Sequence, residues 1–156
     1  MGMSYSWIAF DEPKRSLFEA QLRLKPSPNQ SWLCGVPIRD GKYAVHGPLE
    51  FFEESSLMEL SRESVVVLVN YSDTVSFSSC TCFDGGMVVW SVKVDGDDLS
   101  TKGTLPDAFE KIREDFEWRE TEPLYSMPPE FGEEIVGLHH GVDFGGESAV
   151  FYDRFS

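Results

Sequence analysis

The sequence lacks any long run of apolar residues. No stretch reaches the 18 apolar residues that a membrane-spanning helix needs. The N-terminal residues also lack the basic and apolar regions of a secretory signal. The chain has three cysteines, an odd number, so a disulfide framework is not expected and reduced thiols are the simplest interpretation. Together these absences predict a cytoplasmic protein that does not associate with membranes.

Catalytic and cofactor-binding motifs are missing as well. The chain contains no G-x-S-x-G, P-loop, G-x-G-x-x-G or H-E-x-x-H sequence. Cys80 and Cys82 are one residue apart, which is not the spacing of a redox pair. Cys34 and the three histidines are too scattered to complete a predictable zinc site with them. We therefore expect no catalytic residues, no metal and no cofactor.

Basic residues are scarce relative to acidic ones. Twenty-seven Asp and Glu residues face thirteen Lys and Arg residues, which leaves a net charge of −14. A negative field of this size repels nucleic acids and anionic membranes and attracts cationic partners. Direct binding to nucleic acid is therefore not expected. A basic protein partner is one interpretation of the charge, and solubility alone is the other.

What the chain does contain is enough apolar material for a core. Its 156 residues are 41% hydrophobic and 13% aromatic, which suits one globular domain over residues 1–156. The clearest pattern is central: Val65–Tyr71 is almost continuously apolar, whereas 75–83 and 87–94 alternate. Asp84-Gly85 between the last two segments is a typical hairpin turn. These segments predict a three-stranded antiparallel meander.

The flanking segments predict further strands and helices. Expected strands are 4–10, 42–46 and an edge strand near 148–152, and residues 27–41 read mostly as loop. Expected helices are one with Leu17, Phe18, Ala20 and Leu24 on its apolar side, one over 57–62, one from Pro106 to about Trp118, and one with Phe131, Ile135 and Leu138. A capping box of Ser56 and Glu59 would begin the second helix. The predicted class is α+β, with a central antiparallel β-meander packed against two to four helices.

Acidic residues are concentrated around the third predicted helix. Residues 107–134 hold ten acidic and three basic side chains. Glu residues recur at helical spacing opposite an apolar stripe of Phe109, Ile112 and Phe116. A solvated outer face is the ordinary explanation for such a row. A docking surface for a cationic protein is the functional one. The predicted partner-binding residues are Glu110, Glu114, Glu117, Glu120, Glu122, Asp97 and Asp98.

A histidine pair near the C-terminus is the most enzyme-like cluster. His139 and His140 are followed by Asp143, and an imidazole beside a carboxylate can act as a general base or a metal ligand. Adjacent histidines point in different directions in regular structure, so both rarely serve one ion. We expect these residues to sit at a helix end in contact with solvent.

Four segments resemble an uncharacterised family of small bacterial proteins. They are SYSWIAF at 4–10, FDGGMVVWSVKVDGDD at 83–98, LPDAFEKIRED at 105–115 and EEIVGLHHGVD at 133–143. Family members share a strand similar to DGxxVWSV and a helix that begins LP or PP. The chain departs from the pattern at Val94, where the family has a histidine nearby, and in its longer tail. The resemblance implies no functional residues. In size and charge the chain is also similar to bacterial immunity proteins.

The function expected from these patterns is non-enzymatic. The leading hypothesis is an immunity protein or antitoxin that inhibits a cognate bacterial toxin by covering its basic surface, with a nuclease as the expected class of toxin. One alternative is a DNA-mimic inhibitor of DNA-binding enzymes, which would require charge spread along an elongated face. The other is a small enzyme that uses His139, His140 and Asp143.

Overall fold

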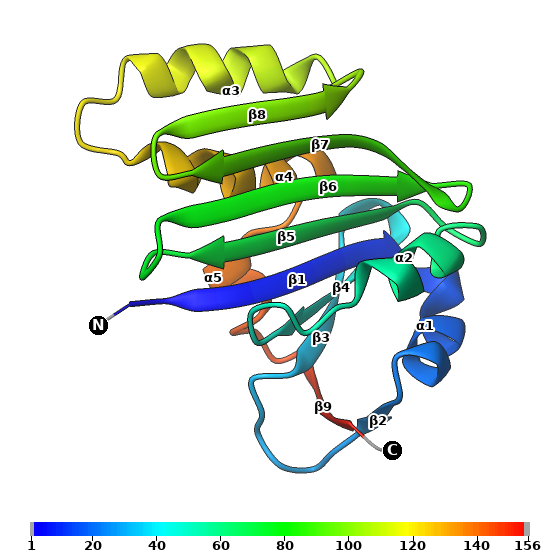
Figure 1. The fold of residues 1–156 in the computed structure, drawn as a ribbon. Coiled ribbons are helices and arrows are strands. Elements are labelled where there is room, and N and C mark those ends of the chain that lie inside the picture. The colour runs from blue at the N-terminus through cyan, green and yellow to red at the C-terminus, as the bar shows by residue number, and fades with distance from the viewer. Residues whose placement is uncertain (1, 155–156) are drawn as a thin grey trace.

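Residues 2–154 are described by the computed structural model, and their strands form one antiparallel sheet (Figure 1). Nine strands pair in the order β2-β9-β3-β4-β1-β5-β6-β7-β8. The strands are β1 Ser4–Asp11, β2 Leu24–Pro26, β3 Cys34–Ile38, β4 Lys42–Gly47, β5 Val66–Ser72, β6 Phe77–Asp84, β7 Met87–Asp95, β8 Asp98–Gly103 and β9 Val150–Arg154. The predicted α+β class is confirmed.

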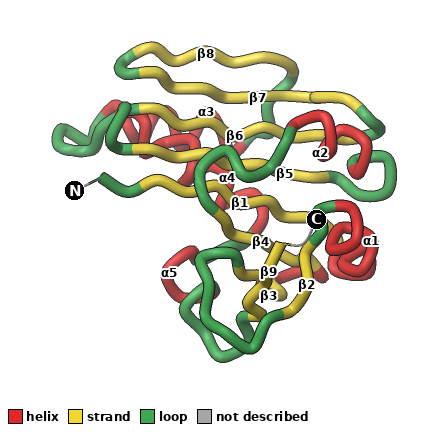
Figure 2. The backbone as a smooth tube through the Cα atoms, turned by 60° about the horizontal axis from the view of Figure 1, so that its bottom comes forward, coloured by secondary structure: helices red, strands yellow, loops and turns green. Residues whose placement is uncertain are grey.

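Helices cover both faces of the sheet (Figure 2). The α-helices are α1 Arg15–Gln21, α2 Glu54–Leu60, α3 Ala108–Glu117, α4 Met127–Val136 and α5 His140–Asp143. Short 3-10 turns lie at Glu12–Lys14, Arg39–Gly41 and Leu124–Ser126. The described residues therefore form five α-helices, one more than the upper expectation, and the additional one is the four-residue α5.

Alternation along the strands separates two hydrophobic cores. Trp7 of β1 packs with Phe109 of α3 and Phe131 of α4 on one side, which we call the α3/α4 face. Its neighbour Ile8 packs with Phe18 of α1 and Leu57 of α2 on the other side, the α1/α2 face. Successive strand residues point to opposite faces, so the apolar run of β1 serves both cores.

The predicted central meander forms as expected. Strands β5, β6 and β7 pair in sequence, with Val67 opposite Cys82 and Cys80 opposite Val92. The turn lies one residue later than predicted, because Gly85 and Gly86 rather than Asp84 and Gly85 have positive φ values, of 61° and 87°. A two-residue turn of this kind requires positive φ at both central positions.

The segment 27–41, predicted mostly as loop, also contains a strand that was not predicted. Strand β3 pairs with β4 and β9, with Gly35 opposite both Val45 and Val150. Glycine is needed at this position because a Cβ atom would overlap the side chain of Tyr43. Glycine and proline at 35 and 37 hid the strand from pattern analysis, since both are depleted in strands.

Helix α1 uses a different apolar face from the predicted one. Phe18 is fully buried and stacks on Phe10 with ring centroids 3.8 Å apart, whereas Leu17 is exposed. Leu24 belongs to β2, because the chain leaves the helix through Arg23 at a φ of 58°. The helical stripe of Leu17, Ala20 and Leu24 was therefore wrong.

Helix α2 begins earlier than predicted and has no capping box. It starts at Glu54, with Glu53 as N-cap and no side-chain capping bond. Ser56 consequently lies inside the helix rather than at its start. Leu57 and Leu60 are its buried residues, so the helix itself and its core contact were correctly placed.

Two strands toward the C-terminus differ from expectation. Strand β8 was not predicted, because its residues Asp98–Gly103 are mostly polar and exposed. Strand β9 was expected at an edge but lies between β2 and β3. The hydroxyl oxygens of Tyr152 on β9 and Tyr43 on β4 are 2.6 Å apart, and Tyr152 also donates to Glu19 of α1 at 2.5 Å. These buried contacts link the C-terminal strand to the N-terminal half of the chain.

Candidate functional site: the acidic face of helix α3

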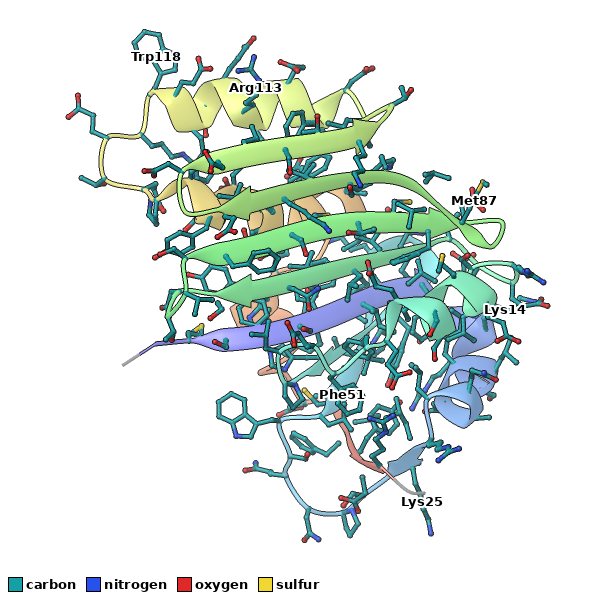
Figure 3. All side chains as sticks on the ribbon, viewed as in Figure 1. Lys14, Lys25, Phe51, Met87, Arg113 and Trp118 are labelled. Atoms are coloured by element: carbon teal, nitrogen blue, oxygen red, sulfur yellow. The ribbon has the colours of Figure 1, made fainter. Side chains whose placement is uncertain are left out.

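Helix α3 forms where the sequence predicted it and packs through its apolar stripe. Phe109 and Phe116 are buried, and the Phe109 ring meets Phe131 of α4 edge-on at 5.3 Å. The chain enters α3 from β8 and leaves toward α4, so α3 lies over the β7–β8 side of the α3/α4 face. The opposite side of the helix faces solvent, and in Figure 3 Arg113 projects from it away from the sheet.

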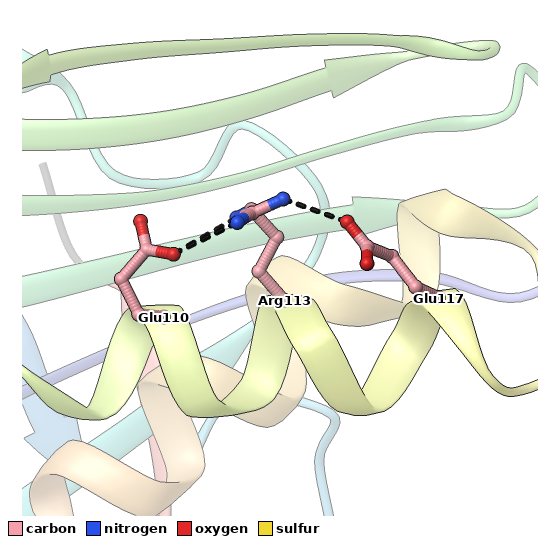
Figure 4. Close-up of polar contacts among 3 residues, drawn as sticks. All are labelled: Glu110, Arg113 and Glu117. Carbon is pink, nitrogen blue, oxygen red and sulfur yellow. Dashed lines mark hydrogen bonds and ion pairs between the residues drawn. The ribbon is translucent and has the colours of Figure 1, made fainter.

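Arg113 lies between two glutamates of the predicted row and pairs with both of them (Figure 4). Its guanidinium donates from Nε and Nη2 to Glu110 at 3.2 and 2.9 Å, and from Nη1 to Glu117 at 2.7 Å. Both carboxylates remain more than 60% exposed. They hold the Arg113 pKa above its usual range, chiefly through the hydrogen bond to Glu110. Glu110 and Glu117 are therefore surface groups, but each shares one positive charge.

Arg119 ties a second set of carboxylates together. It donates to Glu130 of α4 at 3.0 and 3.2 Å and also pairs with Asp115. Its guanidinium lies over the Phe116 ring, 4.3 Å from the centroid. Arg119 thus fixes the end of α3 to α4.

Five of the seven predicted partner-binding residues keep an unshared charge. They are exposed and form no ion pair with any residue of 2–154: Glu114, Glu120, Glu122, Asp97 and Asp98. Asp97 lies in the β7–β8 turn and Asp98 begins β8, at the same end of the sheet as the C-terminal end of α3 (Figure 1). The structure therefore gathers the predicted acidic residues at one end of the molecule, with Glu110 farther along the helix.

An exposed tryptophan lies among these carboxylates and was missed by the sequence argument. Trp118 is 85% exposed and projects from the end of α3 in Figure 3. It borders a groove of about 500 Å³ between α3 and α4, which also contacts Ile112 and Glu134. The exposure of Trp118 could have been predicted from its position two residues after Phe116, which is out of register with the buried stripe. A large aromatic side chain placed there has no core to enter.

The histidine cluster does not assemble as a catalytic group. The Asp143 carboxylate accepts a hydrogen bond from the backbone N–H of His139 at 2.7 Å, not from an imidazole. His139 is exposed, whereas His140 is partly buried against Tyr5, with ring centroids 4.6 Å apart. The expectation of solvent contact therefore holds for His139 and only in part for His140. The other imidazole that packs against His140 is that of His46, which the sequence did not single out.

Among residues 2–154, no group of three His, Cys, Asp or Glu side chains could hold a metal ion. The three cysteines are free and buried, and burial raises the pKa of Cys34 and Cys82 to about 11. Within the same residues, no helix is both long enough and apolar enough to cross a bilayer.

Comparison with known proteins does not indicate a function for this surface. No protein-family model, no curated protein and no solved structure matches the chain. The functional argument therefore depends on the surface of α3 and on the cavities of the fold.

Proposed function

We propose that this protein is a non-enzymatic binding protein whose acidic α3 surface covers a basic protein partner. The surface consists of the unpaired carboxylates of α3 and the following loop, the nearby β7–β8 turn, and Trp118. The observation that carries the proposal is the 85% exposed Trp118, which lies between exposed glutamates in the sequence: Glu114, Glu117 and Glu120. Tryptophan is enriched among the residues that dominate binding energies, and a charged rim steers the encounter.

The partner class follows from the charge. A net charge of −14, with half of it in residues 107–134, favours association with a cationic surface. Enzymes that bind phosphates carry such surfaces, and this supports a nuclease toxin as the partner and an immunity protein or antitoxin as the role. Inhibition would require no chemistry from the inhibitor, because occlusion of the basic site is sufficient.

The ion pairs of Arg113 separate the glutamates of this surface into two groups. Glu110 and Glu117 are held in place by Arg113, so they present a fixed shape rather than a free charge. Glu114, Glu120 and Glu122 supply the unshared charge. We therefore place the electrostatic contribution on these three residues and the apolar anchor on Trp118.

The test uses purified bacterial nuclease toxin domains and measures association rates and inhibition of DNA cleavage. The variant Glu114/Glu120/Glu122→Lys should slow association by at least about tenfold at low salt and flatten its salt dependence. Trp118→Ala should mainly raise the dissociation rate and cost about 2 kcal/mol of binding free energy.

A matched control separates this surface from the net charge. Glu53, Glu54 and Glu59 are exposed acidic residues at or in α2, on the opposite face of the sheet. Their triple reversal to Lys changes the net charge equally and should leave the association rate much less affected. Equal losses in both triple variants would refute the α3 surface. Inhibition of many unrelated DNA-binding enzymes would instead favour the DNA-mimic alternative.

A further inference from the structure

A second cavity lies far from α3, beside α5. It has a volume of about 700 Å³, within the range of small-molecule sites. Strands β3, β4 and β9 form its floor, toward the end of the strand order opposite to β8 (Figure 1). Its principal side chains come from two parts of the chain that are distant in sequence, 32–46 and 140–151: Trp32, Cys34, His46, His140, Phe144 and Phe151.

His46 supplies a hydrogen-bond acceptor at the floor of this cavity. Its side chain is on β4 opposite Cys34, and the residue is 7% exposed. Nδ1 lies 3.0 Å from the carbonyl oxygen of Trp32. A carbonyl can only accept, so Nδ1 carries the proton and Nε2 of the neutral ring has a lone pair. No residue of 2–154 donates to this Nε2, although the ring borders the cavity.

His140 adds a second polar group without a partner. Its Nε2 is buried and makes no hydrogen bond within the described residues. Its ring packs against His46 at 5.0 Å and Phe144 at 5.2 Å between centroids. Burial, and then the neighbouring His46, lower the pKa of His140 to about 4, and burial also lowers that of His46. Both imidazoles are therefore neutral at pH 7.

The walls of the cavity favour a flat, uncharged molecule. Phe144 and Phe151 provide aromatic surfaces, and Trp32, which is 81% exposed, stands at the opening. Glu147 is the one lining residue with a formal charge at pH 7. The negative field of the protein disfavours anions, and no three side chains among residues 2–154 are arranged to hold a metal ion. Aromatic walls with one convergent acceptor are typical of sites for planar ligands.

We propose that this cavity is a binding site for a small, uncharged heteroaromatic molecule whose N–H or O–H group donates a hydrogen bond to His46 Nε2. The site is independent of the α3 surface, because the two share no lining residue. The ring of the ligand lies between the side chains of Phe144 and Trp32, and its hydrogen-bond donor points toward β4.

The test compares two probes of equal shape. Indole carries an N–H donor, and benzothiophene replaces it with sulfur. In NMR titrations of the full chain, indole should shift the amide signals of Gly141, Gly145 and Gly146 and the ¹⁵N signal of His46 Nε2. Indole should bind about fivefold more tightly than benzothiophene, the value of one hydrogen bond. Equal affinities, or shifts spread over the whole surface, would overturn the proposal.

Two tryptophan variants provide a matched pair. Trp32→Ala removes an exposed side chain at the opening and should weaken indole binding about fivefold. Trp118→Ala removes an equally exposed tryptophan on α3 and should leave binding unchanged. His46→Phe should abolish the difference between the two probes. If that variant does not fold, the tryptophan pair still decides, since both side chains lie in solvent. Tighter binding of Zn²⁺ alone, with shifts at His46 and His140, would replace the proposed ligand by a metal.

Discussion

Glu133 is a half-buried carboxyl group on α4, next to Tyr5. Its pKa is raised to about 7, mainly by burial and further by the charge of Glu130. The backbone N–H of His140 donates to the carboxylate and partly opposes the rise. Because protonation is favoured in the folded state, Glu133 stabilises the fold below its unfolded pKa of 4.5. That contribution is lost as pH rises through 7.

Glu133→Gln should therefore change stability in a pH-dependent way. The neutral amide should make the variant more stable than the wild type at pH 8, by about 1–2 kcal/mol after allowance for partial exposure. Near pH 4 the two proteins should have nearly equal stability. Urea denaturation at pH 4, 5.5 and 8 measures the difference. Glu134→Gln, an exposed position on the same helix, is the control, and a Glu133→Gln difference that stayed constant with pH would contradict the argument.

At the scale of the element, α4 depends on a glycine for its approach to the sheet. A Cβ atom at Gly132 would lie 2.6 Å from Cγ2 of Val69 and 3.3 Å from both Cη2 of Trp7 and Sγ of Cys80. Alanine would gain about 1 kcal/mol in helix propensity. The overlap with a fully buried core should exceed this gain, since overpacking costs about 1–3 kcal/mol.

Gly132→Ala is therefore expected to lower the free energy of unfolding by about 1 kcal/mol or more. Gly141→Ala is the matched control, because nothing lies within 4 Å of a Cβ atom at that position in α5. It should be neutral or slightly stabilising. Chemical denaturation of both variants measures the two effects, and a stabilised Gly132→Ala would show that α4 can move away from β5 without cost.

The elements that could be predicted from the sequence are those with a local pattern. The alternation in β7 and the helical stripe of Phe109, Ile112 and Phe116 are visible in short windows, and both elements form as predicted. Strand β3 was missed because its register depends on β4 and on β9, more than 100 residues away. The exposure of the acidic side of α3 could also be predicted from the spacing of its residues in a short window. The pairing of Arg119 with Glu130 was not, because it joins two helices.

At the scale of the whole molecule, distant segments are brought together by the insertion of β9. This strand joins β2 to β3, and with α5 it encloses the cavity that contains His46. No spacing rule relates Trp32, His46 and His140 in the sequence, so the cavity could not be predicted from it. Most of the acidic surface, in contrast, lies in one segment of the chain, 110–122, so the local concentration of acidic residues was enough to indicate it.

The net charge of −14 also bears on stability, because like charges repel one another in the compact state. The Debye length falls from about 30 Å at 0.01 M salt to about 8 Å at 0.15 M. Screening should therefore raise Tm by a few degrees over this range, which corresponds to about 1 kcal/mol. Thermal unfolding at increasing NaCl concentration measures the change. The variant Glu114/Glu120/Glu122→Gln, which loses three unpaired charges, should show a smaller rise. A fall in Tm would mean that the attraction in the ion pairs of Arg113 and Arg119 outweighs the repulsion between like charges. Salt would then weaken this attraction more than it weakens the repulsion.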